Sequence, residues 1–240
     1  MNPTPFLLPG QAAAPPGPAD LSMMYLLHHG FRRDLARFPE AVRRTPFRDR
    51  ATWRALPRRW DLFAAILDDH HHKEDEIVWP LLRQAAASAG DRAALEVIEA
   101  MSEEHLLIDP LLSEARSGLV DLVRDPDERR RLEVVETMQM VGEVLGHHLA
   151  HEERDAITVL QRHVDGAEWA ELERTQLRGG LGLRDLLRML PWVVQHVDPA
   201  VVERQLQESG AGFRVLLALG RGSYRRLDEA AFHYVPDPVR

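Results

Sequence analysis

The sequence predicts an all-α protein, a four-helix bundle formed by a duplicated helical hairpin, with extra short helices at the C-terminal end. Aromatic residues make up only 6% of the chain while Leu, Ala, Glu and Arg are abundant, which favours helices over strands. Apolar residues recur at helical spacing from Asp20 onward. Two similar segments, HHHKEDEIVWPLL from His70 and HLAHEERDAITVL from His148, indicate the duplication.

Proline, glycine and capping residues place the helix ends. Asp20 is a suitable N-cap for a first helix over residues 20–38. Leu56-Pro57 is a favourable start for a second helix, which continues to the alanines before Gly90. Pro80 lies within this second helix or at a kink in it, because proline lacks a backbone donor. Further helices are expected over residues 91–117, 125–164 and 165–178, the last capped by Asp165.

Three domains are expected along the chain. Residues 1–19 are rich in Pro, Ala and Gly and predict a flexible arm. Residues 20–164 form the bundle. Residues 165–240 form a helical extension, with two or three short helices after Gly179-Gly180 that pack on the bundle; no chemistry is recognisable in its sequence.

Composition excludes several classes of function. The net charge is -8 and no basic patch stands out, so we expect no nucleic-acid partner. No apolar run is long enough to span a bilayer, and the N-terminus lacks the features of a signal peptide, so we expect a cytoplasmic protein without a membrane partner. Cysteine is absent, and any metal must therefore be bound through nitrogen and oxygen.

The histidines follow the duplication. Superimposing the repeated segments aligns His70 with His148 and Glu74 with Glu152. In the preceding helices His28 aligns with His105, and the two histidine offsets are 77 and 78 residues. Nine of the 12 histidines fall in these four places, namely His28, His29, His70, His71, His72, His105, His147, His148 and His151.

Helical periodicity predicts which of these side chains face the core. Residues three, four and seven apart share a helix face, and six polar residues share a face with apolar neighbours. These six are His28, His70, Glu74, His105, His148 and Glu152. Buried carboxylates are costly unless they share a cation, so the set predicts two divalent metals bridged by two carboxylates. Nitrogen and oxygen ligands of this kind suit Fe, Mn or Zn.

These motifs resemble the hemerythrin-like, HHE cation-binding family. The resemblance covers roughly residues 20–164 and implies an up-down four-helix bundle around two non-haem iron ions, oxo- or hydroxo-bridged, with Mn or Zn as possible substitutes. It implies that Glu74 and Glu152 bridge the irons and that the four histidines are terminal ligands. The oxygen-carrying members have a further histidine where this chain has Met101. They also place an acid five residues after the histidine of the fourth bundle helix, which is His148 here. This chain has acids both four and five residues after His148, so Glu152 and Glu153 are alternatives for the bridge.

The remaining polar residues have simpler interpretations. A solvated helix face is the favoured interpretation for His29, His71, His72 and His147, and an ordinary surface position for His163, His196 and His233. His151 could support a neighbouring histidine. Asp75 and Glu153 are expected either to hydrogen-bond to metal-binding residues without binding the metal themselves or to be exposed. Tyr25 is expected to pack in the core.

Three functions are compatible with the sequence. The first is a di-iron protein that binds or senses O2, NO or iron. The second is a di-iron oxidoreductase that acts on peroxide or O2, and the third is a metal-free interaction bundle. The first two imply a small diatomic or peroxide ligand and allow a redox partner; no residue is assigned a catalytic role.

Overall fold

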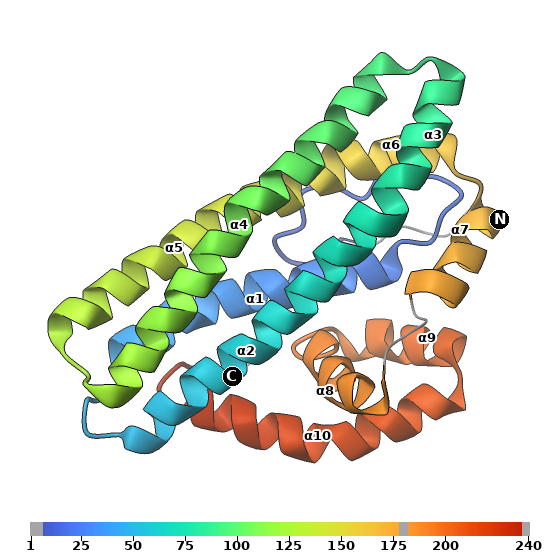
Figure 1. Ribbon diagram of the computed structural model, residues 1–240. Helices are drawn as coiled ribbons and strands as arrows, with labels where there is room; N and C mark the ends of the chain where they lie inside the picture. Colours follow the sequence, from blue (N-terminus) through green and yellow to red (C-terminus); the bar gives the residue numbers. More distant parts are fainter. Residues whose placement is uncertain (1–6, 178–181, 237–240) are drawn as a thin grey trace. The chain divides into compact units, whose positions relative to one another are not determined.

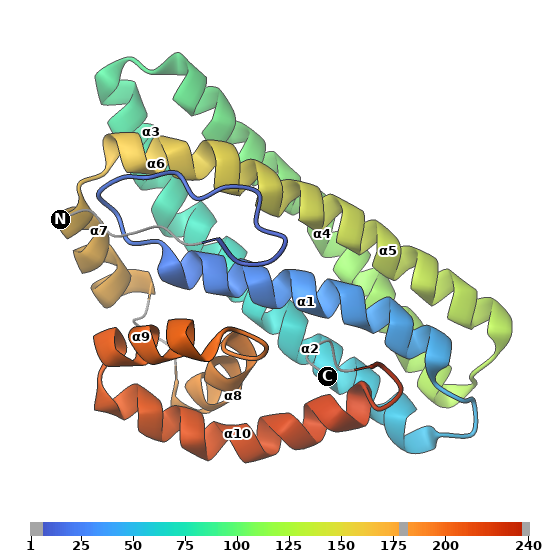
Figure 2. The same cartoon turned by 180° about the vertical axis from the view of Figure 1, so that it is seen from behind.

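The computed structural model describes residues 7–177 and 182–236, and every regular element in these residues is a helix, which confirms the all-α fold. The elements are drawn in Figures 1 and 2. In chain order they are α1 (Ser22–Arg44), α2 (Arg50–Lys73), η1 (Glu74–Val78), α3 (Trp79–Ala89), α4 (Arg92–Arg124), α5 (Glu128–His151), η2 (Glu152–Ala156), α6 (Ile157–His163), α7 (Gly166–Leu172), η3 (Glu173–Leu177), α8 (Leu183–Val193), α9 (Pro199–Ser209) and α10 (Ala211–Ala231).

Aspartate side chains cap the starts of several helices, and the structure corrects some of the sequence-based boundaries. α2 begins at Arg50 and not at Leu56-Pro57, because the Asp49 carboxylate accepts the backbone N–H groups of Ala51 and Thr52. Asp165 caps α7 as expected, accepting the N–H of Ala167 at 2.8 Å. α1 also extends past Pro39 to Arg44, six residues beyond the predicted end.

Two π-helical turns, η1 and η2, interrupt the long helices at equivalent points of the repeat. Each is five residues long and begins at a glutamate, Glu74 in η1 and Glu152 in η2. Pro80 follows η1, but η2 has no proline after it, so proline is not the common cause. Single π turns inside α-helices are rare overall, and those that occur often lie at functional sites. The two glutamates therefore both lie at the first residue of a π turn.

The chain divides into two compact units that alternate along the sequence. Unit 1 comprises residues 1–29, 67–109 and 144–181, and unit 2 comprises residues 30–66, 110–143 and 182–240. Helices α1, α2, α4 and α5 contribute residues to both units. The consecutive domains expected from the sequence, with boundaries after residues 19 and 164, stay a prediction.

In unit 1, the Pro/Ala-rich segment makes specific contacts where a flexible arm was expected. The Ala19 N–H and carbonyl both bond to the Gln161 side chain at 2.9 Å. The Ala12 N–H donates to Glu153 at 2.6 Å. Side-chain acceptors on α6 and η2 thus satisfy backbone donors of a segment that lacks secondary structure of its own. Residues 1–6, also expected to be flexible, lie outside the described residues.

Unit 2 has an aromatic core to which the C-terminal helices contribute. The rings of Phe38, Trp60 and Phe63 lie 4.8 to 5.9 Å apart, and Phe232 lies 5.1 Å from Phe38. α8 packs against α10, and Gly220 permits this because a Cβ there would collide with the Leu187 carbonyl. Figures 1 and 2 both show α8, α9 and α10 side by side.

A buried ion cluster also joins the C-terminal helices to the rest of unit 2. The fully buried Arg59 contacts Asp34 at 2.7 Å and Asp228 of α10 at 3.1 Å. Trp192 of α8 donates from Nε1 to Asp34 at 2.7 Å. The extension therefore has buried polar chemistry that its sequence did not reveal. Among the described residues, no helix combines the length and apolar character that a membrane span requires.

Candidate metal centre

The six residues predicted from the repeat converge in unit 1. His28 lies on α1, His105 on α4, and the remaining four lie where α2 meets η1 and where α5 meets η2. All six are at most 6% exposed, namely His28, His70, Glu74, His105, His148 and Glu152. Four separate helical segments thus direct nitrogen and oxygen atoms toward a common interior.

Two groups of potential ligand atoms, each containing a carboxylate, form around Glu152. The first consists of His28, His70 and Glu152, and the second of Glu74, His148 and Glu152; within each, the atoms lie within 4.8 Å of one another. His28 Nε2 is 3.1 Å from Glu152 Oε2. Sharing of Glu152 between groups is the arrangement that a bridging carboxylate requires.

The two oxygens of Glu74 also approach two different histidines. Its Oε1 is 3.2 Å from His70 Nε2, and its Oε2 is 3.5 Å from His105 Nε2. Neither oxygen of Glu74 or Glu152 accepts a hydrogen bond of acceptable geometry from the part of the chain that the structure describes. A buried carboxylate costs roughly several kcal/mol without compensation, so these four oxygens fit a site for cations.

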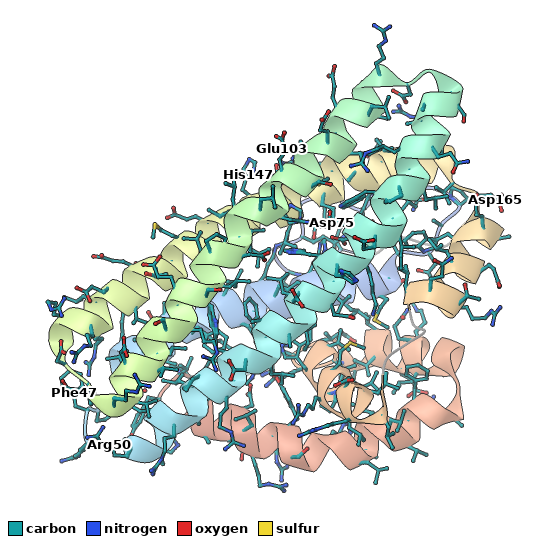
Figure 3. All side chains as sticks on the ribbon, viewed as in Figure 1. Phe47, Arg50, Asp75, Glu103, His147 and Asp165 are labelled. Atoms are coloured by element: carbon teal, nitrogen blue, oxygen red, sulfur yellow. The ribbon has the colours of Figure 1, made fainter. Side chains whose placement is uncertain are left out.

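The outer ring nitrogens of three histidines bond to acids. His28 Nδ1 is 2.9 Å from Glu153, His105 Nδ1 is 3.0 Å from Asp75, and His148 Nδ1 is 2.9 Å from Glu104. Asp75 is labelled in Figure 3, on the first turn of η1. A carboxylate acceptor at Nδ1 places the proton there and leaves the Nε2 lone pair for a metal, as metal-binding histidines commonly arrange.

These contacts separate Glu152 from Glu153, which the sequence left as alternatives. Glu152 faces the shared interior, whereas Glu153 binds the far side of His28 and the Ala12 N–H. The expectation that Asp75 and Glu153 contact histidines from outside is confirmed by the geometry. Glu104 was missed, because its partners His148 and His151 lie on another helix and no sequence pattern links them.

The titration behaviour of the two glutamates differs. Burial raises the pKa of Glu74 well above its usual value, and the charge of Glu152 raises it further. Burial also opposes ionisation of Glu152, but the neighbouring His28, His70 and His148 together outweigh it and lower that pKa. Burial disfavours the charged form of His28, yet Glu152 and Glu153 raise its pKa to about 9. Protons on Glu74 and His28 therefore occupy positions that a divalent cation would take, since metal ligands must be deprotonated.

His71 corrects the sequence-based interpretation. Expected on a solvated face, it is 5% exposed, and its ring stacks on His105 with centroids 3.9 Å apart. A helix turns about 100° per residue, so His70 and His71 face different neighbours. The His70 ring lies 5.3 Å from His28 of α1, while His71 contacts α4. Both are buried because α2 has a helix on each side.

The other histidines follow the expected pattern more closely. His72 and His147 are exposed as predicted, and Figure 3 shows His147 together with Glu103 on the outer surface of α5 and α4. His29 differs, being 9% exposed. His151 is half-buried and bonds to Glu104 at 2.8 Å, which fits the supporting position proposed for it.

Comparison with known proteins adds one finding. A family model described as the hemerythrin HHE cation binding domain matches residues 20–160, more than half of the chain. The matched range contains all six converging residues. No curated protein and no solved structure gives a significant match.

Proposed function

The chain belongs to the hemerythrin HHE cation-binding family, and we propose on that basis that it holds two iron ions in the interior of unit 1. In this proposal Glu74 and Glu152 bridge the two ions. The histidines His28, His70, His105 and His148 are terminal ligands. Mn or Zn could occupy the same nitrogen and oxygen ligands.

One observation supports this proposal above the others. Both oxygens of the buried Glu74 approach histidines, the buried Glu152 belongs to two groups of potential ligand atoms, and within the described residues no hydrogen-bond donor satisfies the oxygens of either glutamate. Glu74 is 1% exposed and Glu152 is 0% exposed. A metal-free interaction bundle gives no reason to bury two adjacent acids, because apolar residues of similar volume would stabilise the core better. Two shared cations provide the missing compensation.

We further propose that the centre binds or senses a small molecule such as O2 or NO. Iron supplies the affinity for such ligands. The chain supplies the buried surroundings, in which His28 and Glu152 are both fully inaccessible. It also fixes the orientation of the imidazoles through Glu153, Asp75 and Glu104. Burial of this degree favours a diatomic or peroxide over a larger substrate.

Metal analysis of the protein purified from its own host, with an optical spectrum, tests this function. We expect two irons per chain and near-ultraviolet absorption that changes on exposure to O2 or NO. Steady turnover of hydrogen peroxide would support a di-iron oxidoreductase that uses the same ligands. A colourless protein without metal, whose melting temperature is unchanged in His70→Ala and Glu74→Ala, would support the interaction bundle and refute the proposal.

A further inference from the structure

A third group of potential ligand atoms in unit 1 contains only histidines. It consists of His71, His105 and His148, whose ligand atoms lie within 4.8 Å of one another. All three are at most 5% exposed. His71 is not among the six residues that the repeat predicts, because its repeat partner is Leu149 and the duplication gives it no counterpart.

The facing nitrogens of His105 and His148 indicate a cation between them. Their Nε2 atoms are 3.2 Å apart, while Asp75 and Glu104 hold the two Nδ1 atoms. With the protons on Nδ1, both Nε2 atoms direct lone pairs at each other, which is repulsive unless a metal ion or a further proton lies between them. Two nitrogens bound at 2.0 to 2.1 Å to one metal would be about 2.8 to 3.4 Å apart for angles between 90° and 109°. The observed separation falls in this range.

His71 completes this pair from α2. Its ring stacks on His105 with an interplanar angle of 13° and meets His148 edge-on at 5.3 Å, so one of the stacked rings must turn for both lone pairs to reach the same metal. Its Nε2 is buried and has no hydrogen-bond partner in the described part of the chain. An unsatisfied buried nitrogen destabilises the fold, and coordination of a metal would remove that penalty. Stacking alone would not require a nitrogen here.

We propose that His71 is a metal ligand and forms a three-histidine site with His105 and His148. This inference rests on the proposed function and deepens it, because it makes the two metal positions unequal. One position has three imidazoles and the other has two, from His28 and His70, while Glu74 and Glu152 are common to both positions. His105, the single histidine of α4, is thereby supplemented from α2, while position 101 of α4 holds a methionine.

Titration of the metal-free full-length chain with Co2+ alone tests this assignment. Cobalt reports its coordination through visible absorption, and competition with a chelator gives affinity. For wild type we expect two bound ions per chain. In His71→Ala one of the two should bind on the order of 100-fold more weakly or worse, because even loss of an outer partner of a ligand commonly costs 10- to 100-fold. Added imidazole should partly restore it.

His72→Ala is the matched control, since His72 is the exposed next residue on the same helix. It should titrate as wild type does. Circular dichroism checks helix content, and His71→Gln replaces the alanine variant if the latter does not fold. If His71→Ala and His71→Gln both bind two ions with wild-type affinity and spectrum, the assignment of His71 is wrong while the proposed function stands. If wild type binds no Co2+, both are wrong.

Discussion

Replacing Glu104 with alanine should weaken metal binding without altering any of the proposed ligands. Glu104 accepts from His148 Nδ1 at 2.9 Å and from His151 Nδ1 at 2.8 Å. It lies on α4, and both histidines lie on α5. Its removal frees the His148 ring to rotate and removes the acceptor that holds the proton on Nδ1.

The expected loss can be estimated from these contacts. Partners of this kind contribute about 10- to 100-fold in metal affinity, which corresponds to about 1.4 to 2.7 kcal/mol. We expect the upper end for Glu104→Ala, because the carboxylate is only 20% exposed and makes charge-assisted bonds to two rings. Glu104→Gln keeps one neutral acceptor, so its affinity should lie between those of alanine and wild type.

Anaerobic competition between the protein and a chelator for Fe2+ measures this effect. Glu103→Ala is the matched control, because Glu103 is the preceding residue and is exposed on the outer surface of α4. Equal iron affinities of Glu104→Ala and Glu103→Ala would refute the view that Glu104 orients a ligand. Comparing the melting temperatures of the metal-free variants separates this effect from a loss of fold.

Three further predictions concern other buried contacts. Arg59→Met should lower the free energy of unfolding in urea by about 3 kcal/mol, because the buried Asp34 and Asp228 each lose one guanidinium partner and keep Arg33 and Arg37, respectively. The exposed Arg58→Met should stay within about 0.5 kcal/mol of wild type. Burial raises the pKa of Asp228, but nearby guanidinium groups outweigh it and lower the pKa to about 2, below an unfolded value of about 3.9. The resulting stability, about 3 kcal/mol, is present above pH 4 and is lost as the pH falls through 2. Asp228→Asn should remove this slope, and an unchanged acid-unfolding curve would contradict it. Ala12→Pro deletes the backbone N–H that donates to Glu153 and should speed the removal of iron by a chelator several-fold. An unchanged rate would show that this contact does not protect the centre.

The sequence was sufficient to predict the helices and the six converging residues. The histidine–glutamate pairs recur at the spacing of one helical turn and at nearly equal offsets along the chain, so the periodicity of the α-helix identifies the buried face. Caps formed by local residues were partly recognisable. Asp165 was identified, but the start of α2 at Asp49 was missed in favour of Pro57.

Features that depend on neighbouring helices could not be predicted. The π turns at Glu74 and Glu152 change the hydrogen-bond register of helices whose sequences look regular. His71 is buried because α2 has helices on both sides. A periodicity analysis that assumes a single buried face cannot predict this. The pairing of Arg59 with Asp228 spans 169 residues, and it appears in neither motif nor composition.

The number of iron ions bound per chain tests the central claim most directly. Titration of the metal-free chain with Fe2+ under anaerobic conditions should reach its end point at two ions for wild type. The double variant Glu74→Gln, Glu152→Gln, which keeps the side-chain volumes but removes both charges, should retain its helix content and lose the tight binding of both ions. Wild-type and double-variant chains that bind equal amounts of iron would contradict a centre held together by these two carboxylates.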